Sequence, residues 1–176
     1  MDKKYAKIND ALNAQMNKEF FSSYTYLAVA SHFENEELPG FANFFKIQAR
    51  EELVHAMKIF DFLHRIGGKT ELGPIAAPKI KIEKPLDAFS FGLKNEMDLA
   101  EDINNILNLS VELKHPPTRV FIFWFVEEQV EEEALFNRCV KRIERVGQDG
   151  QGLLALDREF AERAPATGGG KSDDAD

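Results

Sequence analysis

The sequence is poor in the features that several protein classes need. It contains one cysteine, Cys139, so no internal disulfide can form, and we interpret this residue as a small core side chain. It has no run of about eighteen apolar residues that would predict a membrane-spanning helix, and the start MDKKYAKIND lacks the apolar stretch of a secretory signal. We therefore expect a soluble, cytoplasmic protein with no membrane partner.

The sequence also has fewer basic than acidic residues. The chain has 22 Lys and Arg residues against 30 Asp and Glu residues, a formal net charge of −8. Nucleic acids and anionic membranes are bound by positive surfaces, so this balance argues against a nucleic-acid partner. Cations are the more natural ligands of such a chain.

What the sequence does have is helical periodicity, and no strand pattern competes with it. Its length of 176 residues fits one domain, with the bundle and a final helix over 1–164 and a disordered tail over 165–176. Breaks at Leu38-Pro39-Gly40, Gly67-Gly68, Pro116-Pro117 and the glycines from 147 to 152 separate the periodic segments. They predict helices over 5–37, 41–66, 86–115, 117–147 and 152–163.

The segment from Lys69 to Pro85 carries three prolines and the alternating run KIKIEK, which predicts an extended linker. At about 3.3 Å per residue it can cover the whole length of a neighbouring helix. The second and third helices would then be parallel, in an all-α four-helix bundle with a long crossover and a short fifth helix. A simple up-and-down order is the alternative topology.

Each long segment places a carboxylate near its middle, on the stripe that should be apolar. In 41–66 this stripe is formed by Phe45, Gln48, Glu52, His55, Ile59, Phe62 and Ile66. The other three segments contribute Glu19, Glu96 and Glu128, and Gln129 and Glu132 also lean toward the core. Burying several carboxylates together is too costly unless a multivalent cation or protons neutralise them. The pattern predicts a metal site inside the bundle.

The motif Glu52-Leu53-Val54-His55 supports this interpretation, because it puts a carboxylate and an imidazole on one helix face, one turn apart. The motif alone is common by chance, but carboxylates from three other helices reach the same level, as in di-iron bundles. An oxygen-rich ligand set with one histidine favours iron or manganese, with zinc as an alternative, and iron suits repeated oxidation best. Glu52 is the natural bridge between two ions.

Over about Tyr5 to Arg163 the chain resembles the non-haem ferritins of bacteria and archaea. The stretches that carry the resemblance are NAQMNKEFFSSYTYL, QAREELVHAMKIFDFL, the helix around Glu96, and FIFWFVEEQVEEEALF. The resemblance implies a ferroxidase that oxidises Fe(II) with dioxygen or hydrogen peroxide and stores ferric mineral inside a homo-oligomeric cage, usually of 24 subunits. The segment GLLALDREF is similar to the fifth helix of that family.

The resemblance also implies roles for individual residues. Glu19, Glu52 and His55 would hold one iron, and Glu52 and Glu96, with Gln129 close by, would hold the second. A neighbouring third iron site would be formed by Glu51, Glu128 and Glu132, with Glu131 as a further ligand. Tyr26 would lie beside the centre.

Other family members fit less well. Bacterioferritins place a haem-ligating methionine where this chain has Leu53, so we expect no haem. Their second Glu-x-x-His would end at position 131, which is glutamate here. Mini-ferritins lack such a fifth helix, and rubrerythrins need a cysteine-ligated iron. A structural cage that only binds cations, and an enzyme acting on an organic substrate, are the functional alternatives.

Overall fold

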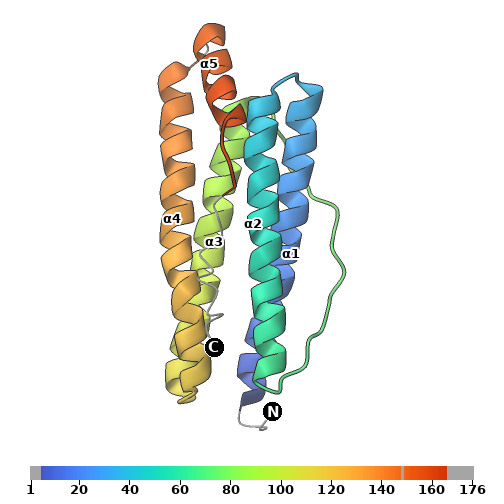
Figure 1. Cartoon of the computed structure of the whole chain (residues 1–176), viewed down its shortest axis with the longest axis vertical. Coiled ribbons are helices and arrows are strands. Elements are labelled where there is room, and N and C mark those ends of the chain that lie inside the picture. Colours follow the sequence, from blue (N-terminus) through green and yellow to red (C-terminus); the bar gives the residue numbers. More distant parts are fainter. Residues whose placement is uncertain (1–4, 148, 166–176) are drawn as a thin grey trace, which may run out of the picture.

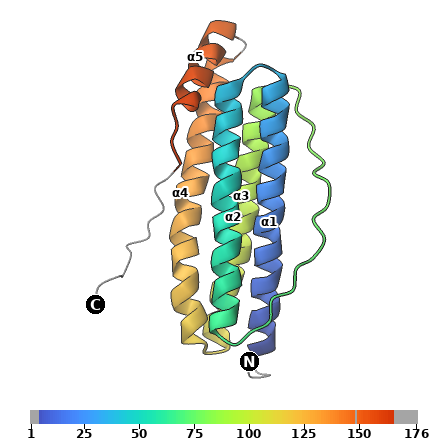
Figure 2. The same ribbon diagram turned by 45° about the vertical axis from the view of Figure 1, so that its right-hand side comes forward.

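The computed structural model describes residues 5–147 and 149–165, and its ordered elements are five α-helices. Four of them are long and lie side by side as a bundle, and the fifth caps one end (Figures 1 and 2). The helices are α1 (Ala6–Asn35), α2 (Pro39–Arg65), α3 (Pro85–Glu112), α4 (Pro116–Val146) and α5 (Gly150–Ala161). The predicted all-α bundle with a short fifth helix is confirmed.

The topology follows from the connections. Short turns join α1 to α2 and α3 to α4 as antiparallel pairs, whereas the segment between α2 and α3 runs along the outside of the bundle from one end to the other (Figure 1). As a result α2 and α3 are parallel, which confirms the long crossover and excludes the simple up-and-down order. At the end of α2, Gly67 has a φ of +69°, and the Gly68 N–H donates to the Leu63 carbonyl, which closes the helix and releases the chain into the crossover.

The predicted helix bounds were wrong by a few residues. Pro39, Pro85 and Pro116 each occupy the first turn of a helix instead of separating two helices, because this position needs no backbone N–H. The third helix stops at Glu112 and not at 115, since the residue before a proline disfavours helical geometry. The fifth begins at Gly150, where the Asp149 side chain accepts a bond from the Gln151 N–H.

The crossover is held on α1 by a ladder of asparagine side chains. These asparagines are spaced by one helical turn on α1, and they bond to the backbone of every second residue of the linker. One turn of the helix therefore matches two residues of the extended chain. The bonds are Lys69 N to Asn9 Oδ1 (2.9 Å), Asn13 Nδ2 to Lys69 O (2.7 Å), Glu71 N to Asn13 Oδ1 (2.7 Å), Asn17 Nδ2 to Glu71 O (2.8 Å) and Gly73 N to Asn17 Oδ1 (2.7 Å).

A layer of polar side chains divides the core into two apolar clusters. Toward the α5 end, one cluster is rich in phenylalanine and includes Phe45, Phe89 and Phe136. Toward the other end, the second cluster includes Leu12, Ile59 and Phe125. The buried polar layer between them contains Gln15, Glu19, Gln48, Glu52, His55, Glu96, Gln129 and Glu132.

The fifth helix is attached to the start of α2 by reciprocal capping. Asp157 of α5 is buried, and its Oδ1 accepts a bond of 2.9 Å from the Phe41 N–H. In return, Asn43 of α2 donates to the Phe160 carbonyl (2.9 Å) and the Arg163 carbonyl (3.0 Å) beyond the end of α5. Gly40 permits the close approach, since a Cβ atom there would lie 1.6 Å from the Asp157 carbonyl oxygen.

Two further expectations concern the chain as a whole. Among the described residues, no helix is both long and apolar enough to cross a membrane. The tail predicted to be disordered falls, from residue 166 onward, outside the described residues. The assignment of 1–164 as one domain stays a prediction.

Candidate metal centre

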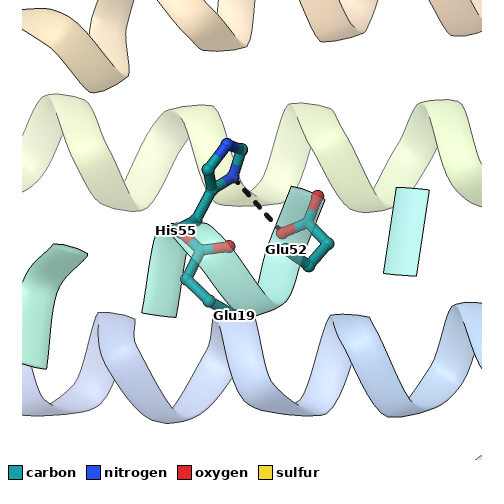
Figure 3. Close-up of side chains that lie close together, drawn as sticks. All are labelled: Glu19, Glu52 and His55. Carbon is teal, nitrogen blue, oxygen red and sulfur yellow. Dashed lines mark ion pairs between the residues drawn. The ribbon is translucent and has the colours of Figure 1, made fainter. Parts of the chain in front are cut away.

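Three side chains in the polar layer meet as a compact group. Glu19 comes from α1, and Glu52 and His55 come from α2 (Figure 3). Each offers one ligand atom, and these atoms lie within 4.8 Å of one another. All three residues are almost completely buried. They match the first iron-binding group implied by the resemblance.

Local helix geometry explains the convergence. Glu52 and His55 are three residues apart, so they share one face of α2, and 3.7 Å separates His55 Nδ1 from Glu52 Oε2. Because α1 is antiparallel to α2, the middle of α1 lies at the same level and brings Glu19 to this face. The Nε2 atom of Gln15, one turn earlier on α1, donates to Glu19 Oε1 at 2.7 Å and fixes its carboxylate.

Most of the polar atoms in this group lack a donor or acceptor. Among the described residues, no hydrogen-bond partner reaches Glu19 Oε2, His55 Nδ1 or either carboxylate oxygen of Glu52. Buried polar atoms are normally paired, and an unpaired one costs about 1–3 kcal/mol or more. A cation between the three residues would supply a partner for one ligand atom of each.

The electrostatics of this group favour protonated carboxyl groups. Burial, with the charge of Glu52, raises the pKa of Glu19 well above its ordinary value. Burial, followed by the charge of Glu96, raises the pKa of Glu52 in the same way. The negative charges of these carboxylates are thus poorly compensated by their surroundings, and either protons or a cation could neutralise them.

Glu96 of α3 forms the opposite side of the polar layer. Its Oε1 accepts a short hydrogen bond from the Tyr26 hydroxyl, and its Oε2 accepts one of 3.1 Å from Gln129 Nε2. Burial raises the pKa of Glu96 to about 7, although the bonds from Tyr26 and Gln129 lower it. Asn95 donates in turn to the Tyr26 oxygen at 3.1 Å, so the tyrosine proton is directed at Glu96.

The acidic residues of α4 differ from the prediction. Glu132 is the buried carboxylate, with 6% exposure, a bond of 2.7 Å from Gln48 Nε2, and a pKa that burial raises to about 8. Glu128, which was expected on the core stripe, has a side chain 28% exposed and lies at the edge of the layer, 4.0 Å from His55 Nε2. The reason is the phase of α4, whose inner face runs through Phe125, Gln129 and Glu132.

The remaining predicted ligands lie farther out. Glu51 is half-buried, and its Oε2 is 3.4 Å from an Arg163 guanidinium nitrogen. Glu131 is exposed on α4. The structure thus gathers Glu19, Glu52 and His55 tightly, places Glu96, Gln129 and Glu132 around them, and leaves Glu51, Glu128 and Glu131 on the outer side.

Sequence reasoning missed the groups that orient the carboxylates. Gln15 and Gln48 each donate to a buried glutamate, and a signal was available because both glutamines occupy helix-stripe positions that ought to be apolar. Trp124 was also missed. Its ring packs edge-on against His55 at a centroid distance of 5.4 Å, and Lys58 lies over its face at 4.1 Å. No local pattern in α4 distinguishes Trp124 from a core aromatic.

A bundle of four long helices that surrounds a histidine and several buried carboxylates defines a class, the metal-binding four-helix bundles. Comparison with known proteins is more specific. A family model described as the ferritin-like domain matches residues 9–146. The chain belongs to the ferritin family.

Individual relatives agree with this assignment. The chain is 36% identical over 154 residues to a bacterial non-heme ferritin of Staphylococcus aureus, covering 88% of this chain and 93% of that protein. A bacterial non-heme ferritin of Staphylococcus saprophyticus is 37% identical over 155 residues, with the same shares covered. Among solved structures, an open pore ferritin from the hyperthermophilic archaeon Archaeoglobus fulgidus has a TM-score of 0.88 and 38% identity, over 90% of this chain and 97% of the other.

Proposed function

We propose that this protein stores iron and that it oxidises Fe(II) to Fe(III) at a two-iron centre within each chain. Membership of the ferritin family supports iron storage. The observation that carries the ferroxidase proposal is the Glu52 carboxylate. It is buried between Glu19 and His55 on one side and Glu96 on the other, and neither of its oxygens has a hydrogen-bond partner among the described residues.

In this proposal Fe(II) is the substrate, and the protein supplies two adjoining positions for it. Glu19, Glu52 and His55 hold the first ion. Glu52 and Glu96 hold the second, with Gln129 beside it. A third ion binds on the outer side at Glu51, Glu128 and Glu132, with Glu131 as the most exposed ligand. Carboxylates and one imidazole suit iron because hard oxygen donors tolerate both of its oxidation states.

The reaction balances with two iron ions. Two Fe(II) ions each give up one electron, and one dioxygen molecule takes both electrons and two protons to become hydrogen peroxide. If hydrogen peroxide is the oxidant, it takes two electrons and two protons and leaves as two water molecules. The carboxylates hold the ions close enough to react together. Tyr26 holds a proton at its hydroxyl, directed at Glu96 Oε1, and so controls the charge on one side of the centre.

Storage requires an enclosed volume, and we propose that copies of this chain assemble into a cage, with 24 as the expected number. Exposed apolar side chains on α1, α2, α4 and the crossover support burial against other copies. The largest exposed fractions in this set belong to Val120, Leu72, Val130 and Val54. We further propose that the protein is cytoplasmic. We also propose that it binds no haem, since Leu53 offers no ligand to a haem iron.

The decisive experiment is stopped-flow oxidation of Fe(II) by the apo-protein under air, with the assembled mass recorded in parallel. Glu52→Ala should reduce the initial rate to that of Fe(II) in free solution, while Glu101→Ala, which removes an exposed glutamate of α3, should leave it unchanged. If the unaltered protein oxidised Fe(II) no faster than buffer, the ferroxidase proposal would be wrong, and a cage that only binds cations would replace it.

A further inference from the structure

Arg163, just beyond α5, is held on α2 by three separate contacts. Its carbonyl accepts a bond of 3.0 Å from Asn43, its guanidinium carbon lies 4.5 Å from the centre of the Phe44 ring, and its Nη2 is 3.4 Å from Glu51 Oε2. The side chain is 21% exposed, and among the described residues its Nη1 has no hydrogen-bond partner. The guanidinium is therefore fixed against Glu51 and is not free in solvent.

The charge of Glu51 also acts on Glu128 and Glu132, the other carboxylates on the outer side of the centre. Glu51 is next to Glu52 in the chain, and its charge is one of the causes, after burial, that raise the pKa of Glu128 and of Glu132. Glu51 thus interacts with both of the other carboxylates of the proposed outer site. Arg163 forms an ion pair with Glu51 itself.

We propose that Arg163 sets the affinity of the third cation position, because its guanidinium occupies the side of Glu51 that an incoming divalent ion would use. This inference rests on the proposed third site at Glu51, Glu128 and Glu132. A divalent cation bound to Glu51 must displace the guanidinium or sit beside a fixed positive charge, and arginine cannot lose its proton to relieve the repulsion. The outer position is consequently weaker than the two inner positions, where among the described residues no lysine or arginine forms an ion pair with Glu19, Glu52 or Glu96.

The test is calorimetric titration of the assembled apo-protein with Zn(II), which binds without being oxidised. In Arg163→Gln the weakest binding phase should tighten about tenfold, the effect of removing one partly buried charge worth about 1.4 kcal/mol. Arg163→Lys keeps a positive charge near Glu51 and should tighten the weakest phase less than Arg163→Gln does. Arg142→Gln is the matched control, since it breaks the ion pair with Glu159 that also joins α5 to the bundle but does not touch Glu51.

A Glu51→Gln change added to Arg163→Gln should abolish the tightened phase. Unchanged titration of Arg163→Gln, absence of any Glu51-dependent phase, or equal tightening in Arg142→Gln would each overturn the inference. Absence of the two tighter phases from every protein, the unaltered one included, would contradict the proposed function instead, because those phases depend on Glu19, Glu52, His55 and Glu96. Circular dichroism and assembled mass verify that each variant is folded.

Discussion

At the scale of single residues, the buried carboxylates are a cost to the apo-protein. Glu19, Glu52 and Glu96 are all fully buried. Among the described residues, one carboxylate oxygen of Glu19 and both of Glu52 have no hydrogen-bond donor. A packing core would place apolar side chains here, as it does in the clusters on both sides. The polar layer therefore does not contribute to stability as an apolar layer would, which supports the proposed metal centre.

Glu52→Gln should make the apo-protein more stable. Glutamates whose pKa is raised on folding stabilise the protein below their unfolded pKa, near 4.5, and this stability is lost as pH rises through about 7 for Glu96 and about 8 for Glu132. Apo-protein stability should thus fall between about pH 5 and pH 8. Removing the Glu52 charge should recover about 2 kcal/mol at pH 8, or roughly 4–8 °C in Tm.

Thermal unfolding of metal-free protein at several pH values checks this expectation. Glu101→Gln, at an exposed position, serves as the control and should follow the unaltered protein. A Glu52→Gln variant that unfolds at a lower temperature at pH 8 would show that the carboxylate stabilises the bundle by itself.

Tyr26→Phe should shift the pH dependence of metal binding upward. The Tyr26 hydroxyl lowers the pKa of Glu96 by donating to its carboxylate, so without it Glu96 would hold its proton above pH 7. A hydrogen bond to a charged group is worth about 1.5–3 kcal/mol, which corresponds to a shift of about one pH unit or more. Zn(II) titrations from pH 5.5 to about pH 8 measure the midpoint, and Tyr24→Phe on the exposed face of α1 should leave it in place.

At the scale of elements, α5 is fixed by backbone contact with the start of α2. Gly40→Ala should separate the two, because the added methyl group would lie 1.6 Å from the Asp157 carbonyl and also 2.9 Å from the Ala161 nitrogen. Overpacking of this kind costs about 1–3 kcal/mol. Hydrogen exchange should become faster across 150–161 while α1 to α4 keep their protection.

The control for this prediction is a glycine of α5 itself. Gly150 has open space around the position of a Cβ atom, so Gly150→Ala should leave the protection of α5 unchanged. Equal exchange in the unaltered protein and in Gly40→Ala would mean that α5 is not held by this contact.

Periodicity was sufficient to predict the helices and the inward face of α2. All the residues of its predicted stripe from Phe45 to Phe62 are buried, and so are Glu19 and Glu96. The predicted burial of Glu128 was wrong because α4 has acidic residues on several faces, and a small error in helical phase exchanges one glutamate for another. The roles of the predicted residues as metal ligands stay predictions.

Contacts between distant segments left no signal in the sequence. Asn9, Asn13 and Asn17 resemble an ordinary polar helix face until the crossover is seen to lie on them. Asp157 and Phe41 are likewise too far apart in the chain for a capping motif to be recognised. Both devices depend on tertiary structure, which local spacing does not encode.

At the scale of the whole molecule, metal binding and stability should be coupled. A cation at Glu19, Glu52 and His55 would neutralise the repulsion between carboxylates in the centre of the bundle, between its two apolar clusters. Zn(II) at a hundred times its dissociation constant should stabilise the folded protein by about 2.7 kcal/mol, or roughly 5–10 °C in Tm. A chelator should reverse the gain.

Differential scanning calorimetry with and without Zn(II) measures this effect, and Glu52→Gln should show little of it. A gain in Tm that persisted in Glu52→Gln would indicate that Zn(II) acts at some other part of the surface.

The asparagine ladder has a consequence for where the chain can accept new sequence. Four residues of α1 rise about 6 Å, and two residues of an extended chain span about 6.6 Å. The spacing of the asparagines on α1 therefore fixes which crossover residues they can bond. Adding one residue between Lys69 and Gly73 would turn the bonded amides away from the asparagines, and this stretch should reject peptide insertions. Residues 74–77 follow the last asparagine-bonded residue, Gly73, so an insertion there would leave all of these hydrogen bonds in place.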